Sequence, residues 1–276
     1  MTTATLLVTC KDRSGLVAAL SEFVFRHGGN IIDLDQHTAE ESGSFFMRLV
    51  FDISGFRQDR PGIIAAVAQL GHSQKVATSL TFADNRPKVA VLCSKVPHCL
   101  YDLLLCQQLG ELGGDIVAVM SNHNHLRPVA QHFSLPFHHL PISSDGSSDG
   151  ASAKAATEAQ QDQLLSDLGI EVVILARYMQ ILSPALVARW HGRIINIHHS
   201  FLPAFVGAKP YHQAKERGVK IIGATAHYVT SELDQGPIIE QDVCRVTHRD
   251  DVDSLVRKGR ELERQVLTRA VKLHLE

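Results

Sequence analysis

The stretch Ile194-Ile-Asn-Ile-His-His-Ser-Phe-Leu-Pro203 begins as an apolar strand that carries polar side chains at Asn196 and His198. These two residues are two positions apart, so their side chains point to the same face of a strand. A buried amide and imidazole cost free energy unless they are paired, and open α/β sheets bind ligands at the carboxyl ends of their strands. From this strand alone, a functional role and a structural role in tying down the next loop are equally favoured.

The surrounding chain alternates apolar strands with helices. The strands are expected at 89–93, 115–120, 137–141, 172–176 and 193–198, and the helices at 98–109, 126–132, 153–168 and 184–190, with a Ser/Gly/Asp-rich loop at 143–152. A helix near 211–217, strands at 222–229 and 236–242 and a closing helix at 251–275 follow. Continuous apolar runs are typical of parallel strands buried on both faces. The pattern predicts an α/β domain with a doubly wound, mostly parallel, Rossmann-like sheet.

The N-terminal part has a different order of elements. Strands are expected at 5–10, 31–37, 45–51 and 76–83, and helices at 16–24 and 62–70. This βαββαβ order predicts a ferredoxin-like domain. The polar segment Asp84-Asn-Arg-Pro-Lys88 is the expected boundary, which divides the chain into domains 1–84 and 85–276.

Composition narrows the class of protein. The 276 residues are 45% hydrophobic and 20% charged, and 27 Lys and Arg against 29 Asp and Glu give a net charge of -2. This balance argues against nucleic acid as the main partner. The five cysteines are scattered, without a C-x-x-C pair, as in a reducing cytosol. The N-terminus shows no secretory signal, and the longest apolar stretch, 172–190, is interrupted by polar residues, so we expect a cytoplasmic protein without a membrane span.

A second polar feature follows the apolar strand that begins near Ile222. Asp234 lies in a polar turn just before the Gly236-Pro237 bend, where most Asp residues bind only the local backbone. If the sheet brings Asp234 close to His198, then Asn196, His198 and Asp234 supply an oxyanion donor, a proton donor and an orienting base. His227 either supports this group from a second layer or is a satisfied core histidine.

Several segments together resemble the folate-dependent formyltransferases: Asn196-Ile-His198, Ser200-Phe-Leu-Pro203, Gly223-Ala-Thr-Ala-His227 and Leu233-Asp-Gln-Gly-Pro-Ile-Ile239. The resemblance is closer to the formyltetrahydrofolate deformylase family, which also carries an N-terminal ACT domain, and residues 1–83 resemble one. It covers nearly the whole chain. It implies that Asn196, His198 and Asp234 are catalytic. It also implies hydrolysis of 10-formyltetrahydrofolate to formate and tetrahydrofolate, which balances the one-carbon pool and is linked to purine biosynthesis.

The same resemblance implies where the folate substrate binds. The implied contacts are Met179, Gln180, Ile181, Leu182, Ser200, Phe201, Leu202 and Pro203. Gln180 stands where an Arg is usual; we expect this change to be tolerated if main-chain atoms hold the pterin, as in related enzymes. The family also leads us to expect a short further β segment after the last helix.

The ACT-like domain implies a small effector, an amino acid for example, at an interface between paired domains. The candidate effector residues are Asp12, Gly15, Leu16, Asn30 and Ile31. A role in assembly alone has nearly equal weight. Pairing of two such sheets covers sticky edge strands, and the resemblance implies a homo-oligomer, either a dimer or a tetramer.

The loop after the first strand of the larger domain bears on the formyl acceptor. A nucleotide phosphate needs backbone N–H groups that approach closely, usually through glycines. The stretch Ser94-Lys-Val-Pro-His-Cys99 has no glycine and includes a proline, which favours water as the acceptor. The alternatives are a formyltransferase that uses an amine acceptor, and a catalytically silent folate or amino-acid sensor.

Metal and cofactor sites are not expected. The loop histidines His123, His125, His138 and His139 lack an H-E-x-x-H pattern or clustered acidic partners. No G-x-S-x-G or P-loop motif is present. We therefore expect no metal and no bound prosthetic group, with the folate as substrate.

Overall fold

The computed structural model describes residues 2–142, 148–204 and 210–275. The chain divides into two compact units, Met1–Arg86 and Pro87–Glu276. The first carries an antiparallel sheet and the second a mostly parallel one, which confirms the predicted α/β class.

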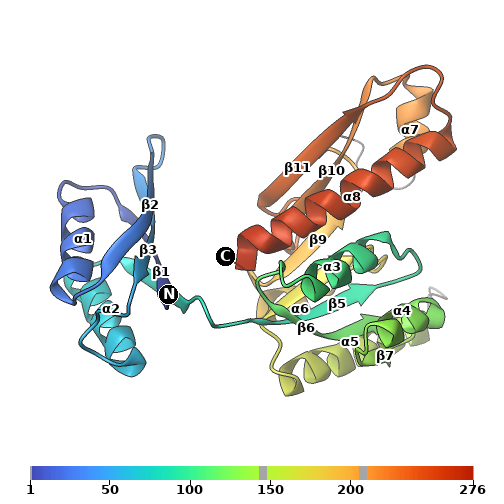
Figure 1. The fold of residues 1–276 in the computed structure, drawn as a ribbon. Helices are drawn as coiled ribbons and strands as arrows, with labels where there is room; N and C mark the ends of the chain where they lie inside the picture. Colours follow the sequence, from blue (N-terminus) through green and yellow to red (C-terminus); the bar gives the residue numbers. More distant parts are fainter. Residues whose placement is uncertain (1, 143–147, 205–209, 276) are drawn as a thin grey trace. The chain divides into compact units, whose positions relative to one another are not determined.

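The first unit has the predicted βαββαβ order. Its elements are β1 (Thr3–Lys11), α1 (Leu16–Arg26), β2 (Asn30–Ala39), β3 (Ser44–Asp52), α2 (Arg60–Gln74) and β4 (Ala77–Phe82). The strands form a four-stranded antiparallel sheet in the order β2-β3-β1-β4, and α1 and α2 cover one of its faces (Figure 1). Because strand side chains alternate, Leu6 and Val8 of β1 are buried under the helices whereas Leu7 is 47% exposed.

The second unit contains the alternating elements. In chain order they are β5 (Lys88–Cys93), α3 (His98–Gln108), β6 (Asp115–Ser121), η1 (Asn124–Leu126), α4 (Arg127–His132), β7 (Phe137–His139), α5 (Ser148–Asp167), β8 (Val172–Ala176), α6 (Pro184–Arg189), β9 (Ile194–His198), α7 (Pro210–Glu216), β10 (Ile221–Tyr228), β11 (Ile238–Arg245) and α8 (Val252–Leu275). These bounds agree with the predicted ones to within a few residues, apart from α5. We predicted a loop over 143–152, whereas α5 already begins at Ser148; residues 143–147 lie outside the described part.

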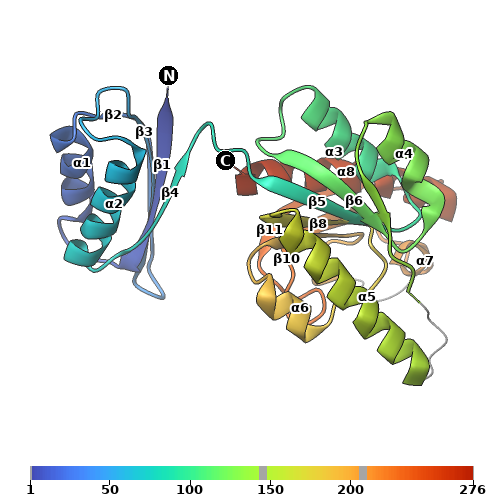
Figure 2. The same cartoon turned by 90° about the horizontal axis from the view of Figure 1, so that it is seen from below.

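The seven strands of this unit lie in the order β11-β10-β9-β8-β5-β6-β7. Neighbours from β9 to β7 are parallel, while β10 and β11 are antiparallel additions. Helices α3 and α8 cover one face of the sheet and α5 and α6 the other, as Figure 2 shows. Each face has its own apolar core. No helix in the described ranges is long and apolar enough to cross a membrane.

Strand β9 shows how this layering exposes polar side chains. Ile195 and Ile197 are buried in the core beneath α3 and α8. Alternation therefore turns Asn196 and His198 toward the opposite face. The strand thus buries Ile195 and Ile197 on one face and places the polar side chains of Asn196 and His198 on the other.

Helix α8 packs closely on α7 through a glycine. A Cβ added at Gly259 would overlap the hydroxyl and ring of Tyr211. The Tyr211 hydroxyl donates a 2.7 Å hydrogen bond to Glu263, one turn further along α8. Gly259 therefore leaves the space that lets this buried bond form.

We predict that Gly259→Ala destabilises the second unit by about 1 kcal/mol or more, because overpacking outweighs the gain in helix propensity. Trp190, the single tryptophan, lies in this unit and reports its urea unfolding by fluorescence. Glu261→Ala, on the exposed side of the same helix, is the control. Equal stability of the two variants would contradict the prediction.

Candidate active site

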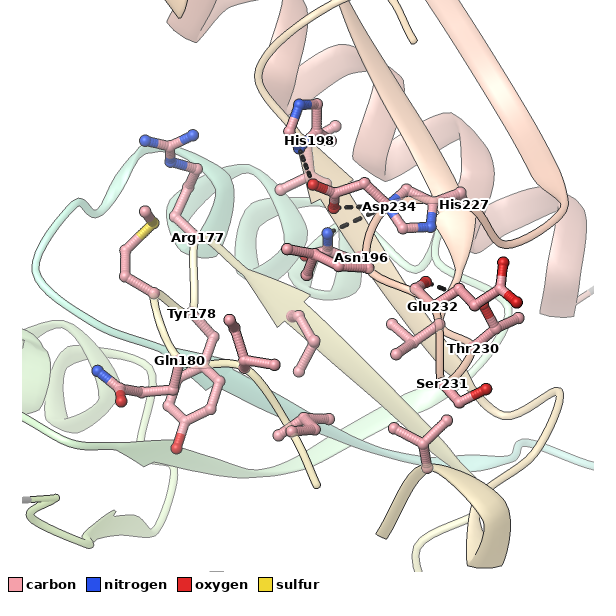
Figure 3. A pocket seen from close by; sticks show the side chains of 18 of the residues that line it. Arg177, Tyr178, Gln180, Asn196, His198, His227, Thr230, Ser231, Glu232 and Asp234 are labelled. Atoms are coloured by element: carbon pink, nitrogen blue, oxygen red, sulfur yellow. Dashed lines mark hydrogen bonds and ion pairs between the residues drawn. The ribbon is translucent and has the colours of Figure 1, made fainter. Parts of the chain in front are cut away.

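A cavity of about 390 Å³ lies at the carboxyl ends of β8 and β9. Asn196 and His198 line one wall, together with His227 and Asp234 (Figure 3). The segment from Arg177 to Leu182 lines the cavity from β8, and the segment from Val229 to Asp234 from the loop after β10. The predicted catalytic residues therefore meet in one hollow at the sheet edge where α/β folds bind ligands.

The pairing of β9 with β10 brings His227 into this group. In the antiparallel register, His227 lies opposite Asn196, and directly opposed side chains in such a pair share a face. Asn196 Nδ2 and His227 Nε2 are 3.2 Å apart. The contact with Asn196 therefore supports the interpretation of His227 as a residue that positions this group.

Asp234 reaches the group from the loop between β10 and β11. Its φ of +56° is in the left-handed region, which residues other than glycine seldom adopt. Its Oδ2 lies 3.3 Å from His198 Nδ1 and its Oδ1 lies 3.6 Å from His227 Nε2. The carboxylate is thus shared between two buried imidazoles, as the dashed lines in Figure 3 indicate.

His198 sets the charge of Asp234. Its hydrogen bond is the largest cause that lowers the pKa of the Asp234 carboxyl far below the usual range, against the opposing effect of burial. Asp234 is therefore an anion at neutral pH. An anionic carboxylate can hold an imidazole in position and stabilise a positive charge on it.

Hydrogen-bond chemistry shows which nitrogen of His198 is available to a ligand. A carboxylate only accepts, so His198 Nδ1 carries the proton that it donates to Asp234. His198 Nε2 is buried and has no hydrogen-bond partner among the described residues. This nitrogen is free to exchange a proton with a bound substrate.

A contact with His227 orients the amide of Asn196. His227 Nδ1 is 2.9 Å from the carbonyl oxygen of Tyr228, so Nδ1 carries a proton. In the neutral ring Nε2 then accepts a hydrogen bond from Asn196 Nδ2. The second Nδ2 hydrogen of Asn196 is left for a ligand in the cavity.

The segment from Arg177 to Leu182 forms another wall, and buried polar groups hold it and the following Ser183 in place. The N–H of Met179 donates to Ser94 Oγ at 3.1 Å, and the Tyr178 hydroxyl accepts from Gln161 at 2.7 Å. The N–H of Ser183 donates to Glu158 at 3.1 Å. The predicted folate contacts Met179, Gln180, Ile181 and Leu182 all border the cavity between these anchors.

The other predicted folate segment, Ser200 to Pro203, lies elsewhere; none of its residues is among the described residues that line this cavity. The hydroxyl of Thr225 donates to the Ser200 carbonyl at 2.9 Å and accepts from the N–H of Leu202 at 3.0 Å. Ser200 and Leu202 are buried. Phe201 is 42% exposed and borders a separate apolar cavity. The structure therefore does not bring the two predicted folate segments together.

The candidate effector residues fall into two separate groups in the first unit. Asp12, Gly15 and Leu16 follow the end of β1, which pairs with Ser44 at the start of β3. Asn30 and Ile31 pair with the far end of β3, about 25 Å away at 3.3 Å per residue. The side chain of Leu16 is in the core. One small molecule on one copy of this unit therefore cannot touch both groups.

A buried charged network next to the candidate active site was missing from the prediction. Arg177 borders the main cavity and lies 3.4 Å from Glu263 of α8, which is 1% exposed. His98 also contacts this carboxylate, at 2.9 Å. Arg177 directly follows an apolar strand, and this is the signal that could have identified it. Nothing local in the sequence marks Glu263.

Fold and site together define the class of protein. Residues 87–271 match the model of the formyl transferase family, and residues 4–58 match that of the ACT domain. An Asn, a His and an Asp thus meet at the sheet edge of a formyl transferase domain that follows an ACT domain.

Comparison with individual proteins narrows the family. The chain is 50% identical to the formyltetrahydrofolate deformylase of Synechocystis over 99% of its own length and 94% of that protein. It is 48% identical to the one from Bacillus subtilis, over 98% and 88%. The crystal structure of a Pseudomonas syringae formyltetrahydrofolate deformylase matches with a TM-score of 0.95 at 43% identity, over 100% of this chain and 90% of that one. The chain belongs to the formyltetrahydrofolate deformylase family.

We predict that His199, the residue after His198, stays neutral well below neutral pH. Burial, and then the charge of Arg177, lower its pKa to about 4. NMR of the imidazole resonances, assigned with His199→Gln, should show a titration near pH 4; a midpoint between 6 and 7 would contradict it.

The lowered pKa of His199 also predicts how the stability of the folded chain depends on pH. The unfolded chain protonates His199 near pH 6.5 and the folded chain at about 4, so stability is lost as pH falls through this window. The His199→Gln variant should lose less stability than the wild type over the same window.

Proposed function

We propose that this chain hydrolyses 10-formyltetrahydrofolate to formate and tetrahydrofolate, with water as the formyl acceptor. The observation that carries the proposal is the cluster of Asn196, His198 and Asp234 on one wall of a cavity, in a chain of the deformylase family. The folate is the substrate, and the proposed chemistry uses side chains of this chain.

The reaction passes through a tetrahedral intermediate. Water attacks the formyl carbon, the carbonyl oxygen gains negative charge, and the bond from carbon to the folate nitrogen then breaks. The free Nδ2 hydrogen of Asn196 and the Nε2 of protonated His198 are the donors for this oxyanion. Such donors act strongly in a water-poor pocket because they are already oriented before charge develops.

Protons must move twice for the reaction to balance. The attacking water loses one proton, and the departing folate nitrogen gains one. His198 Nε2 is the group that the geometry makes available for this transfer, while anionic Asp234 holds the ring through Nδ1. Asp234 also stabilises the imidazolium that exists between the two transfers.

The folate lies along the wall from Met179 to Leu182 in this proposal. Met179 and Ile181 are 57% and 61% exposed, so they offer apolar contact to a flat ring. The anchors of this segment at Ser94, Gln161 and Glu158 hold its main chain ready for hydrogen bonds. A fixed main chain makes pterin binding insensitive to the side chain at Gln180.

Water as acceptor is supported by the loop after β5. Ser94, its first residue, is buried and already occupied, because its hydroxyl donates to Asn122 at 2.7 Å and accepts from Met179. Pro97 has no N–H to offer. This loop is therefore poorly suited to cradle a nucleotide phosphate.

We further propose that the ACT-like unit binds an amino-acid effector between paired copies and that the protein is a homo-oligomer. The separation of the two candidate effector groups within one copy supports a shared site. A cytoplasmic location is supported by the free thiols of all five cysteines.

The direct test is formate release from purified protein and 10-formyltetrahydrofolate without an added amine. We expect equal amounts of formate and tetrahydrofolate from the wild type. Asp234→Asn and His198→Ala should fold normally and lose about two to three orders of magnitude in rate. Asp242→Asn, on β11 and paired with Arg269, is the matched control. Near-normal turnover by the two site variants, or release that requires an amine, would overturn the proposal.

We also predict that His227→Gln lowers kcat about ten- to hundredfold with little change in KM, because the Asn196 amide loses its fixed orientation. Steady-state kinetics separate the two parameters. A raised KM with unchanged kcat would instead mean that His227 contributes to binding of the folate.

A further inference from the structure

A second cavity, of about 180 Å³, lies beside the main one in the same unit. It is bordered by the loop before α3, by α7 and by α8. Arg177 and His199 line both cavities. The smaller cavity therefore adjoins the place where the proposed reaction occurs, and the acidic and basic side chains around it are His98, Arg177, His199, His212, Arg260 and Glu263.

The charges around this cavity are unequal. Glu263 is buried, and burial opposes its ionisation, but contacts with His98, Arg177 and Tyr211 outweigh this effect and lower the pKa of its carboxyl. Its negative charge is balanced by Arg177 at 3.4 Å. Arg260 makes no hydrogen bond or ion pair with the residues that the structure describes. The cavity therefore keeps an unbalanced positive charge.

Buried polar atoms at this cavity also have unused bonding capacity. His98 Nε2 donates to Glu263 at 2.9 Å, whereas its Nδ1 is buried without a partner among the described residues. Arg177 Nε likewise has no hydrogen bond there, because its contact with Glu263 is an ion pair of imperfect geometry. Buried groups of this kind normally find a partner.

Arg177 is held in an unusual backbone conformation. Its φ is +61°, in the left-handed region that is unfavourable for a long side chain. Residues held in such conformations cluster at functional sites. The side chain is 15% exposed and lies between the two cavities.

We propose that the smaller cavity binds the formate anion released by the reaction, between Arg177 and Arg260. This inference rests on the proposed function and extends it to the path of the anionic product. A small cavity with an unpaired guanidinium at Arg260 and a free N–H donor at Arg177 Nε suits a small carboxylate, and it is too small to hold the folate as well. Formate reaches it past Arg177 and His199 while tetrahydrofolate still occupies the main cavity.

A metal ion is the competing occupant, because ligand atoms of His98, Cys99 and Glu263 lie within 4.8 Å of one another. Metal ligation by cysteine requires the thiolate. Burial raises the pKa of the Cys99 thiol well above its usual value. Both Glu263 oxygens already accept hydrogen bonds, from Tyr211 and from His98. These three side chains are therefore poorly suited to bind a metal cation, and the cavity is better suited to an anion.

The test titrates sodium [13C]formate into the full-length protein at constant ionic strength and follows binding by 13C NMR. Product inhibition by formate is measured alongside. We expect Arg260→Gln to weaken both formate binding and inhibition about fivefold, the value of an exposed charge pair. The control is Arg257→Gln, which removes an exposed arginine on the same helix that is bonded to Ser254.

The outcomes separate the two proposals. Formate binding that Arg260→Gln leaves unchanged, or that Arg257→Gln weakens equally, would overturn the formate site. Absence of formate binding to an active wild type would overturn it as well. The titration needs no turnover, so failure to hydrolyse formyltetrahydrofolate would count against the proposed function alone.

Discussion

The register between β9 and β10 is the constraint on which the site depends. It places His227 opposite Asn196, and it places Thr225 opposite His198. The contact with His227 orients the Asn196 amide, and the hydroxyl of Thr225 makes hydrogen bonds with the segment that follows β9. A slip by one residue would turn Asn196 and His198 into the core beneath α3 and α8. The backbone hydrogen bonds between β9 and β10 therefore stabilise the sheet and also determine which of its faces Asn196 and His198 lie on.

The carboxylate of Glu263 joins elements that are far apart in the chain. It accepts hydrogen bonds from His98, at the start of α3, and from Tyr211, in α7, and it pairs with Arg177, after β8. Burying a carboxylate is unfavourable unless its oxygens are satisfied. Here groups from three separate segments of the chain satisfy them. The closing helix α8 therefore lines the smaller cavity and also packs in the core.

Strained backbone marks the edges of the main cavity. Arg177 and Asp234 both have positive φ and both line it. Each conformation is unfavourable by about 1 to 3 kcal/mol and persists because surrounding contacts determine it. For Asp234 those contacts are His198 and His227, and for Arg177 the contact is Glu263. These contacts thus hold the backbone in the conformations that orient the two side chains.

The sequence alone determined the alternation of strands and helices, the two kinds of domain, and the shared face of Asn196 and His198, because each depends on local periodicity. Its motifs also located Asp234, but only the fold brought Asp234 to within 3.3 Å of His198. The tertiary structure alone decided that Ser200 to Pro203 lies away from the main cavity, since Thr225, more than twenty residues later, binds it. It also decided that Glu263 serves Arg177 and His98. Contacts between residues so distant in the chain arise from the packing of elements, which local sequence patterns do not encode.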